Sequence, residues 1–157
     1  MTIEVKFICD DHCGRLARWL RFIGYDCAYE RDIDDNTLLK RATGEDRIIL
    51  TRDSKIPERA MARTVIVVDS PVPLVQLRQV IGDLNLTLGP DRIGTRCSVC
   101  NGMADTVALE DIAERVPPYV RQTQTSFREC ATCRRIYWHG THVKNMIAKL
   151  SDAGLLV

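Results

Sequence analysis

The sequence predicts an α/β protein in which helices flank a central parallel sheet, followed by a small C-terminal zinc ribbon. Two observations lead to this prediction. Between residues 3 and 84, strand-like and helix-like apolar patterns follow each other four times, an order that is typical of a parallel sheet covered on both faces. Beyond residue 95, two C-x-x-C pairs appear in a loop-rich context, which is typical of a zinc ribbon.

The first strand and helix are expected at residues 3–9 and 15–22. In the first segment apolar and polar residues alternate, which indicates a strand. In the second the apolar residues fall on one helical face, and Gly24 follows where a C-terminal cap is needed. A second short strand is then expected at residues 25–29.

The next helix is expected at residues 36–43, with either Asp34 or Asp35 capping its free amides and with Gly44 ending it. Its apolar residues recur at helical spacing. The run at residues 47–51 is rich in isoleucine and leucine, and we expect it to form a third buried strand.

The remaining elements of the sheet region are a short helix at residues 54–62, a β-branched strand at residues 64–68 and a longer helix after Pro71 and Pro73. Four apolar residues are expected to face inward from that last helix: Leu74, Leu77, Ile81 and Leu84.

A polar segment containing glycine and proline at residues 88–95 separates this region from the cysteine pairs. We therefore place a domain boundary there. Residues 1–90 are expected to form the first domain, and residues 95–157 a ribbon with a C-terminal helix.

The composition, with 45% hydrophobic and 27% charged residues, is that of a soluble globular protein. No apolar stretch approaches the roughly 18 residues that a membrane-spanning helix needs, and the N-terminus lacks the features of a signal peptide. We therefore expect a cytoplasmic protein. Cysteines stay reduced in that compartment, so the seven cysteines indicate metal binding rather than disulfides.

Cys97, Cys100, Cys130 and Cys133 are the predicted ligands of one structural zinc ion. Each C-x-x-C turn presents two thiolates to the same ion, and two turns complete a tetrahedral shell. Because this shell has no open position, its expected role is folding rather than catalysis. A thioredoxin-like redox site is the alternative, but it uses a single pair at the start of a helix.

The other cysteines and two histidines have simpler expected roles. Cys9, Cys13 and Cys27 belong to strands or to a helix start, where a small buried side chain is more common than a nucleophile. His139 and His142 lie near the second pair and could replace a cysteine as a ligand. Since four cysteines suffice, we interpret the histidines as structural or facing RNA.

Aspartates follow the predicted strands, at the edge of a parallel sheet where ligands bind. Crowded carboxylates repel one another, and a shared Mg²⁺ or Mn²⁺ ion would relieve that repulsion. Capping of turns and helices is the alternative explanation. It is expected to account for Asp69 and for one of Asp32, Asp34 and Asp35. The residues concerned are Asp10, Asp11, Asp32, Asp34, Asp35, Asp53 and Asp69.

Arginines accompany these acids. Arg15, Arg18 and Arg21 recur at helical spacing opposite the apolar face, and Arg52 precedes Asp53. A basic stripe beside an acidic metal site suits a polyanionic substrate, and phosphodiester hydrolysis is the matching chemistry. A solvated helix face explains the stripe equally well.

Several segments resemble the Mut7-C ribonuclease family, a branch of the PIN-like nucleases. Residues 10–24, 32–42 and 48–53 are similar to the nuclease part of that family. The two cysteine pairs, with residues 116–119 and 137–140 around them, resemble the zinc ribbon that closes it. The resemblance covers nearly the whole chain and implies a PIN-like nuclease domain.

The resemblance also implies a site made of Asp10, Asp35 and Asp53, which would bind Mg²⁺ or Mn²⁺, with Asp32 or Asp34 as helpers. Asp35 is assigned because it precedes the helix at the same place as an acid of related PIN-like proteins.

From the residues and the resemblance together we hypothesise a metal-dependent endoribonuclease in which Arg15, Arg18 and Arg52 hold the RNA backbone. Two alternatives stay open. One is a non-catalytic RNA-binding protein that uses the zinc ribbon for recognition. The other is a phosphatase or nucleotide hydrolase that uses the same acidic edge.

Overall fold

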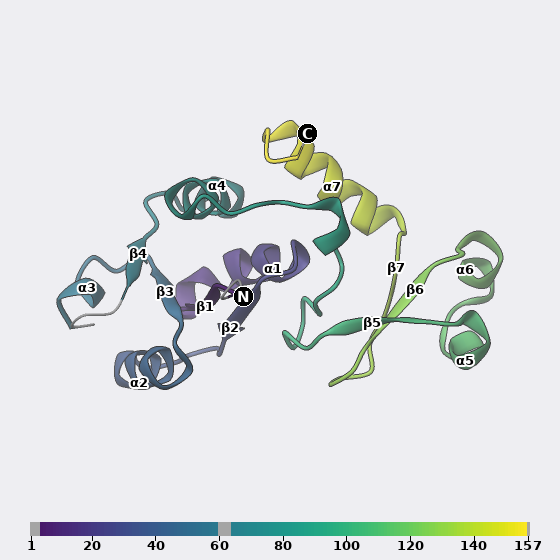
Figure 1. The fold of residues 1–157 in the computed structure, drawn as a ribbon, viewed down its shortest axis with the longest axis horizontal. Helices are drawn as coiled ribbons and strands as arrows, with labels where there is room; N and C mark the ends of the chain where they lie inside the picture. The colour runs from purple at the N-terminus through teal and green to yellow at the C-terminus, as the bar shows by residue number, and fades with distance from the viewer. Residues whose placement is uncertain (1–3, 60–63, 157) are drawn as a thin grey trace.

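The computed structural model describes residues 4–59 and 64–156. The molecule is elongated, with the parallel sheet and its helices at one end and a second, smaller sheet at the other (Figure 1). Two expected elements extend beyond this range. Residue 3 of the first strand and residues 60–62 of the short helix lie outside the described residues.

The central sheet has four parallel strands, as predicted: β1 (Lys6–Cys9), β2 (Asp26–Tyr29), β3 (Ile48–Thr51) and β4 (Val65–Val67). Their spatial order is β2-β1-β3-β4, so β1 and β3 are central neighbours and β2 is an edge strand. Every neighbouring pair is parallel. The carboxyl ends of all four strands therefore lie along one edge.

Helices cover both faces of this sheet. α1 (Gly14–Phe22) and α4 (Pro73–Leu84) contribute to the core on one face, and α2 (Asp35–Glu45) and α3 (Ile56–Arg59) to the core on the other. Successive residues of a strand point to opposite faces, so β1 supplies both cores. The first core includes Phe7, Cys9, Leu16, Leu20, Leu77 and Val80, and the second includes Ile8, Leu38, Ala42, Ile49 and Ile56.

The ends of α2 differ from the expectation at one position. Gly44 does not end the helix but lies inside it, and Asp46 ends it in the left-handed conformation at φ 53°. Aspartate tolerates that conformation better than most residues, which explains why Asp46 rather than Gly44 can end the helix. At the other end Asp34 is the cap, because its carboxylate accepts a hydrogen bond from the Thr37 amide at 2.9 Å.

The smaller sheet is antiparallel and consists of β5 (Ala104–Val107), β6 (Phe127–Cys130) and β7 (Ile136–Trp138), in that order. Between β5 and β6 the chain forms α5 (Leu109–Ile112), the 3₁₀ turn η3 (Ala113–Arg115) and α6 (Pro118–Thr123). These helices pack on the sheet through a third apolar cluster. That cluster contains Ile112, Val116, Val120 and Phe127.

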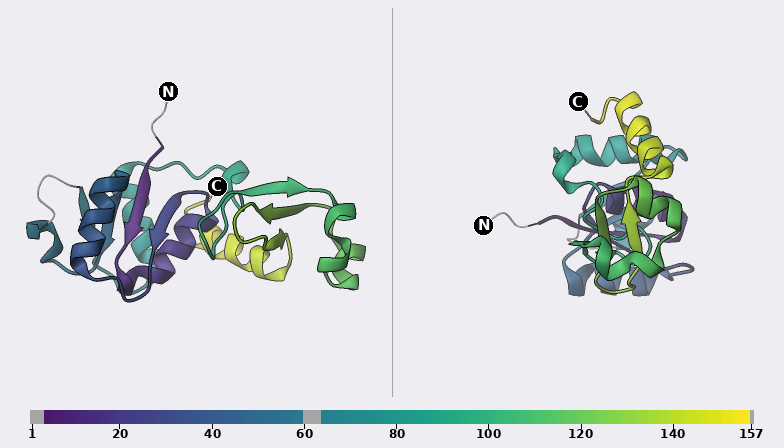
Figure 2. Two further views of the ribbon diagram at one scale, coloured as in Figure 1. Left: turned by 90° about the horizontal axis from the view of Figure 1, so that it is seen from below. Right: turned by 90° about the vertical axis from the view of Figure 1, so that its right-hand side faces the viewer.

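The last helix, α7 (Thr141–Asp152), returns from the ribbon to the parallel-sheet end, as the views of Figures 1 and 2 agree. Its Leu150 is fully buried in the same core as α1 and α4. The segment expected as a linker also packs there: its 3₁₀ turn η2 (Pro90–Arg92) places the Arg92 guanidinium 4.3 Å from the centre of the Tyr25 ring. The domain boundary near residue 90 stays a prediction. No helix in residues 4–59 or 64–156 is long and apolar enough to cross a bilayer.

Two polar side chains fix the ribbon to the parallel sheet. Arg21 of α1 is buried and donates hydrogen bonds to the carbonyls of Cys27 at 2.8 Å and of Ser98 and Val99 at 3.1 Å each. The sequence had placed Arg21 in an exposed stripe, and this expectation is wrong. Asn101 accepts a hydrogen bond from the amide of Cys27 at 3.0 Å, so it covers the free edge of β2.

We expect Arg21→Ala to lower the free energy of unfolding by about 3 kcal/mol, because three carbonyls, one buried and two partly buried, lose a charged donor. Urea unfolding measures the change. Arg18→Ala is the matched control on the same helix, since Arg18 is exposed and its removal should change stability by no more than about 0.5 kcal/mol. Equal stability of the two variants would contradict the docking role of Arg21.

Candidate functional site

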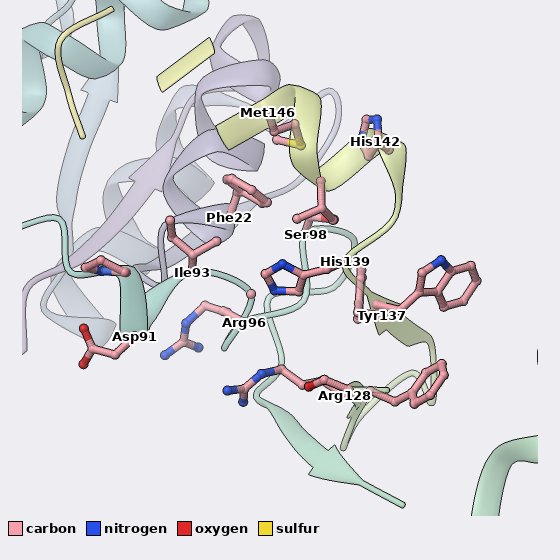
Figure 3. Close-up of a pocket in the computed structure, with 16 residues that line it drawn as sticks. Phe22, Asp91, Ile93, Arg96, Ser98, Arg128, Tyr137, His139, His142 and Met146 are labelled. Atoms are coloured by element: carbon pink, nitrogen blue, oxygen red, sulfur yellow. The ribbon is translucent and has the colours of Figure 1, made fainter. Parts of the chain in front are cut away.

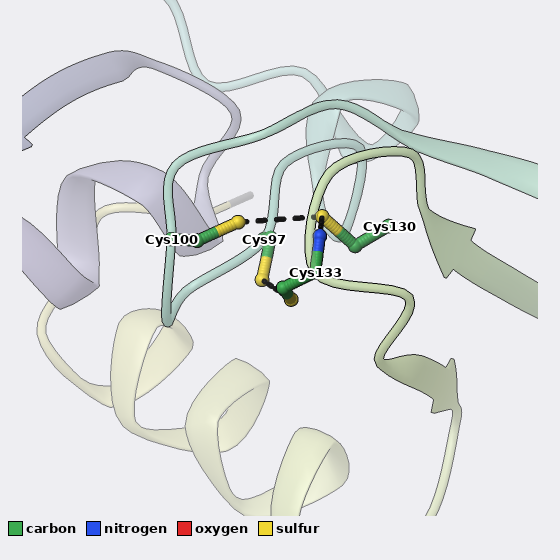
Figure 4. A group of neighbouring side chains, drawn as sticks. All are labelled: Cys97, Cys100, Cys130 and Cys133. Carbon is green, nitrogen blue, oxygen red and sulfur yellow. Dashed lines mark hydrogen bonds between the residues drawn. The ribbon is translucent and has the colours of Figure 1, made fainter.

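The sulfur atoms of Cys97, Cys100, Cys130 and Cys133 converge at one point between the two turns, as Figure 4 shows. All four lie within 4.8 Å of one another. Cys97 and Cys133 are 3.7 Å apart, and Cys100 and Cys130 are 3.4 Å apart. Four sulfur ligands around one point fit a tetrahedral zinc site, so the predicted cluster forms.

Backbone amides support this arrangement. The Gly102 amide donates to the Cys100 sulfur, and the amides of Thr132 and Cys133 donate to the Cys130 sulfur, each at 3.4 Å. Gly102 is also a steric requirement, because a Cβ atom there would lie 3.0 Å from the Cys130 sulfur and 2.7 Å from the Thr132 hydroxyl. The two turns can approach each other only with glycine at this position.

The thiols also have the electrostatics of a metal site. Burial raises the pKa of Cys97, but the Tyr137 hydroxyl at 2.8 Å and nearby amides outweigh it and lower the pKa to about 6. Burial and the neighbouring cysteines raise the pKa of Cys100 to about 12. Four thiolates can therefore coexist here only when a cation balances their charge, which a divalent metal ion does.

The acidic edge is organised around one threonine. Thr51 ends β3 and is fully buried, and its hydroxyl donates a hydrogen bond to the carboxylate of Asp10, which follows the neighbouring strand β1. The same hydroxyl oxygen accepts a hydrogen bond from the amide of Asp53 at 2.9 Å. Thr51 thereby connects two of the three predicted aspartates across adjacent strands.

Asp10 and Asp53 keep acceptor capacity beyond these contacts. Asp10 is 8% exposed and also accepts the His12 amide at 3.0 Å, so it caps the 3₁₀ turn η1 (Asp11–Cys13). Asp53 is exposed and accepts the Lys55 amide at 2.8 Å. Each carboxylate oxygen has more than one lone pair, so both groups could still bind a cation.

Asp35 is the first residue of α2, beyond the cap Asp34, and its side chain is exposed. Arg59 of α3 forms an ion pair with it at 2.8 Å. Its second carboxylate oxygen is left for another ligand. The hydrogen bonds to Thr37 lower the pKa of Asp34, so that residue is committed to the helix cap.

Asp11 and Asp32 also have structural contacts. The Asp11 carboxylate accepts the amide of Asp32 at 2.7 Å, and Asp32 adopts a left-handed conformation at φ 59°. Asp69 follows β4 and is exposed, and its amide donates to the side chain of Gln79 at 3.1 Å.

The acids do not converge as the cysteines do. Among the residues that the structure describes, the four cysteines form the one group of three or more histidine, cysteine or acidic side chains that could hold a metal ion. Asp10 and Asp53 are connected through Thr51, whereas Asp35 is connected to Arg59. The assignment of Asp10, Asp35 and Asp53 to one metal ion stays a prediction.

The remaining cysteines are not nucleophiles. Cys9, Cys13 and Cys27 are fully buried, as expected. Burial raises the pKa of Cys9 well above its usual value, and burial with the nearby Asp10 carboxylate raises that of Cys13 to about 12. The thiols of Cys9 and Cys13 therefore stay protonated near neutral pH, and all three buried cysteines pack as small apolar side chains.

An open groove begins beside Asp11 and runs along α1. It has a volume of about 470 Å³, and Arg15 and Arg18 line it. Neither arginine forms an ion pair with an acid in the described ranges. The groove ends at Ser98 and Val99 of the first cysteine turn, so the acidic edge and the ribbon border the same space. Arg52 is exposed beside Asp53.

Sequence reasoning did not single out Thr51 or Asn101. A hydroxyl residue at the end of a buried strand, two positions before a candidate acid, is the signal that could have identified Thr51. No local signal marks Asn101, because its partners Asp26 and Cys27 are about 75 residues away in the sequence.

Comparison with known families gives one match. The family model described as "Mut7-C RNAse domain" matches residues 5–150, which include the acidic edge and all four clustered cysteines. No curated protein and no solved structure matches the chain.

Proposed function

Because the chain belongs to the Mut7-C RNAse domain family, we propose that it is a metal-dependent endoribonuclease that hydrolyses RNA phosphodiester bonds at its acidic edge. The family supports a ribonuclease-type function with RNA as the substrate. We further propose that the activity depends on a metal ion, that the RNA is cut internally and that the aspartates named below form the site. A PIN-like character of the sheet domain is also our proposal.

The observation that carries the proposal is the Asp10–Thr51–Asp53 connection. It holds the carboxylate of Asp10 and the backbone amide of Asp53 at the carboxyl ends of adjacent parallel strands, the usual location of ligands in such sheets. Thr51 orients Asp10 from a buried position, so this carboxylate is held in place without a neighbouring cation. The exposed carboxylate of Asp53 faces the solvent from which substrate arrives.

In the proposed mechanism Asp10, Asp35 and Asp53 would hold Mg²⁺ or Mn²⁺, with Asp32 as the helper because Asp34 caps α2. A bound ion of this kind lowers the pKa of a water molecule and stabilises negative charge on a phosphate. One of the aspartates accepts a hydrogen bond from the attacking water and orients it toward phosphorus. Arg15, Arg18 and Arg52 bind the phosphates on either side of the scissile bond.

The groove along α1 supports this placement of the RNA. Its arginines carry positive charge that no carboxylate of the described residues neutralises, and it starts next to the proposed site. A backbone that follows the groove reaches the first cysteine turn. We therefore infer that the ribbon extends the RNA-binding surface, while its zinc ion stabilises the fold. The unpaired thiols of Cys9, Cys13 and Cys27 and the clustered zinc thiols suit a reducing, cytoplasmic location, which we also propose.

A circular single-stranded RNA tests the central claim. We expect the purified protein to linearise it in the presence of Mn²⁺ or Mg²⁺, since only an endonuclease can cut a molecule without ends. Gel electrophoresis separates circles from linear products. Calcium, which binds oxygen ligands with looser geometry, serves as the comparison ion.

Three outcomes would contradict the proposal. An intact circle with every divalent ion, together with tight RNA binding, would favour the RNA-binding alternative. Cleavage of linear RNA alone would indicate an exonuclease. Hydrolysis of nucleotides or small phosphate esters without RNA cleavage would favour a phosphatase.

A further inference from the structure

A second cavity lies between the ribbon and α7, away from the acidic edge. Its volume is about 230 Å³, roughly that of seven or eight water molecules at about 30 Å³ each. Figure 3 shows the labelled side chains around it: Asp91 on one side, His139 near the centre and His142 on the outer side. The segment before the ribbon, the strands β6 and β7 and the start of α7 all contribute to its wall.

Two arginines give this cavity a positive character. Arg96 donates to the Asn101 carbonyl at 2.9 Å and Arg128 to the Ala104 carbonyl at 3.1 Å, which fixes both guanidinium groups. In Figure 3 they extend in the same direction. Neither pairs with a carboxylate in residues 4–59 and 64–156, and the Nε atom of Arg96 is buried without a hydrogen-bond partner. Asp91 is the one acid in the wall.

The wall also offers flat ring surfaces. The imidazole of His139 lies above the two arginines in Figure 3, and His139 is exposed. The rings of Phe22, Tyr137 and Trp138 are part of the same wall. Cations with spare donors beside aromatic and imidazole faces are the combination that recognises a phosphate and an unpaired base together.

We propose that this cavity binds one nucleotide of a single-stranded RNA, with Arg96 and Arg128 on its phosphate and His139 stacked on its base. The inference rests on the proposed function only in taking RNA as the ligand. The cavity is a separate site from the aspartates, so a strand bound here and cut there must span both the sheet domain and the ribbon. A base of a double-stranded RNA would first have to be unpaired and unstacked at a free-energy cost, so a single strand is the favoured ligand.

Binding measured without cleavage tests this site. Fluorescence anisotropy with a labelled 12-nucleotide RNA, zinc-loaded protein and no Mg²⁺ or Mn²⁺ gives the Kd at several salt concentrations. For Arg96→Ala/Arg128→Ala we expect a Kd at least about 10-fold higher. The slope of log K against log salt should become shallower by about 0.7, because the two arginines bind one phosphate. His139→Ala should raise the Kd and leave the slope unchanged.

The matched control is Arg121→Ala/Lys149→Ala, which removes the same charge from exposed positions outside the cavity wall. Zinc content and circular dichroism establish that each variant is folded. If the Arg96→Ala/Arg128→Ala variant fails to fold, His139→Ala decides, because the His139 side chain is exposed. Unchanged Kd values in the cavity variants would overturn the proposal. So would a rise in the Kd of the control variant as large as that of the cavity variants. RNA binding at the cavity by a protein that cuts no RNA would support this site while contradicting the proposed nuclease.

Discussion

Asp53→Asn is expected to lower the rate of RNA cleavage at least about 100-fold, which corresponds to about 2.7 kcal/mol of lost transition-state stabilisation. The amide has the size of the carboxylate and can still accept the Lys55 amide, so the turn after β3 should keep its shape. The amide lacks the negative charge of the carboxylate and is therefore a weaker ligand for a divalent cation. Asp10→Asn should have an effect of similar size, because the buried Thr51 hydroxyl holds this side chain in place.

Asp69→Asn is the matched control, since Asp69 also follows a strand of the sheet and is exposed. We expect it to cleave at the wild-type rate. Single-turnover rates on a labelled RNA, measured over a range of Mn²⁺ concentrations, separate a lost metal ligand from a lost fold. If Asp53→Asn cleaves as fast as Asp69→Asn, the aspartates do not form the active site.

Cys130→Ser should abolish zinc binding and unfold the ribbon. Cys130 is buried, its sulfur accepts two amides, and zinc binding contributes about 10–16 kcal/mol to the folding of small zinc domains. The effect should reach the parallel sheet, because Arg21 and Asn101 join the first cysteine turn to β2. We therefore expect thermal stability to fall in the parallel-sheet region as well as in the ribbon.

Val99→Ala is the control for this variant, because Val99 lies within the first cysteine turn but exposes 44% of its surface. Metal analysis should find about one zinc ion per chain in wild type and in Val99→Ala, and none in Cys130→Ser. Differential scanning calorimetry gives the accompanying change in Tm. A Cys130→Ser protein with a full zinc content and an unchanged Tm would show that the cluster is not a zinc site.

The elements of the parallel sheet could be predicted because each depends on a local pattern. The run of residues 48–51 is apolar on both faces, and the structure buries it in the centre of the sheet. The cysteine cluster was predictable for a chemical reason, since a C-x-x-C turn places two sulfurs together in almost any context. Gly24 was predictable because its φ of 92° favours glycine after a helix.

Other features depend on contacts between distant residues, which no local pattern encodes. Arg21 has the same helical spacing as Arg15 and Arg18, yet it is buried, and two of its three acceptors lie 77 and 78 residues away. The choice between Asp34 and Asp35 as the cap of α2 needed the position of Thr37. The sequence placed aspartates at one edge of the sheet but could not specify that Arg59 would pair with Asp35.

The return of α7 has a consequence for how the protein is made. The four strands of the parallel sheet are complete once Val67 has been synthesised, but Leu150 is needed to finish the core that α1 and α4 share. A nascent chain therefore carries an uncovered apolar surface on these helices while the whole ribbon is being translated. Because α7 follows the ribbon in the chain, we expect folding of the ribbon around zinc to bring α7 toward that surface. We expect the chain to be prone to aggregate for as long as that surface stays open.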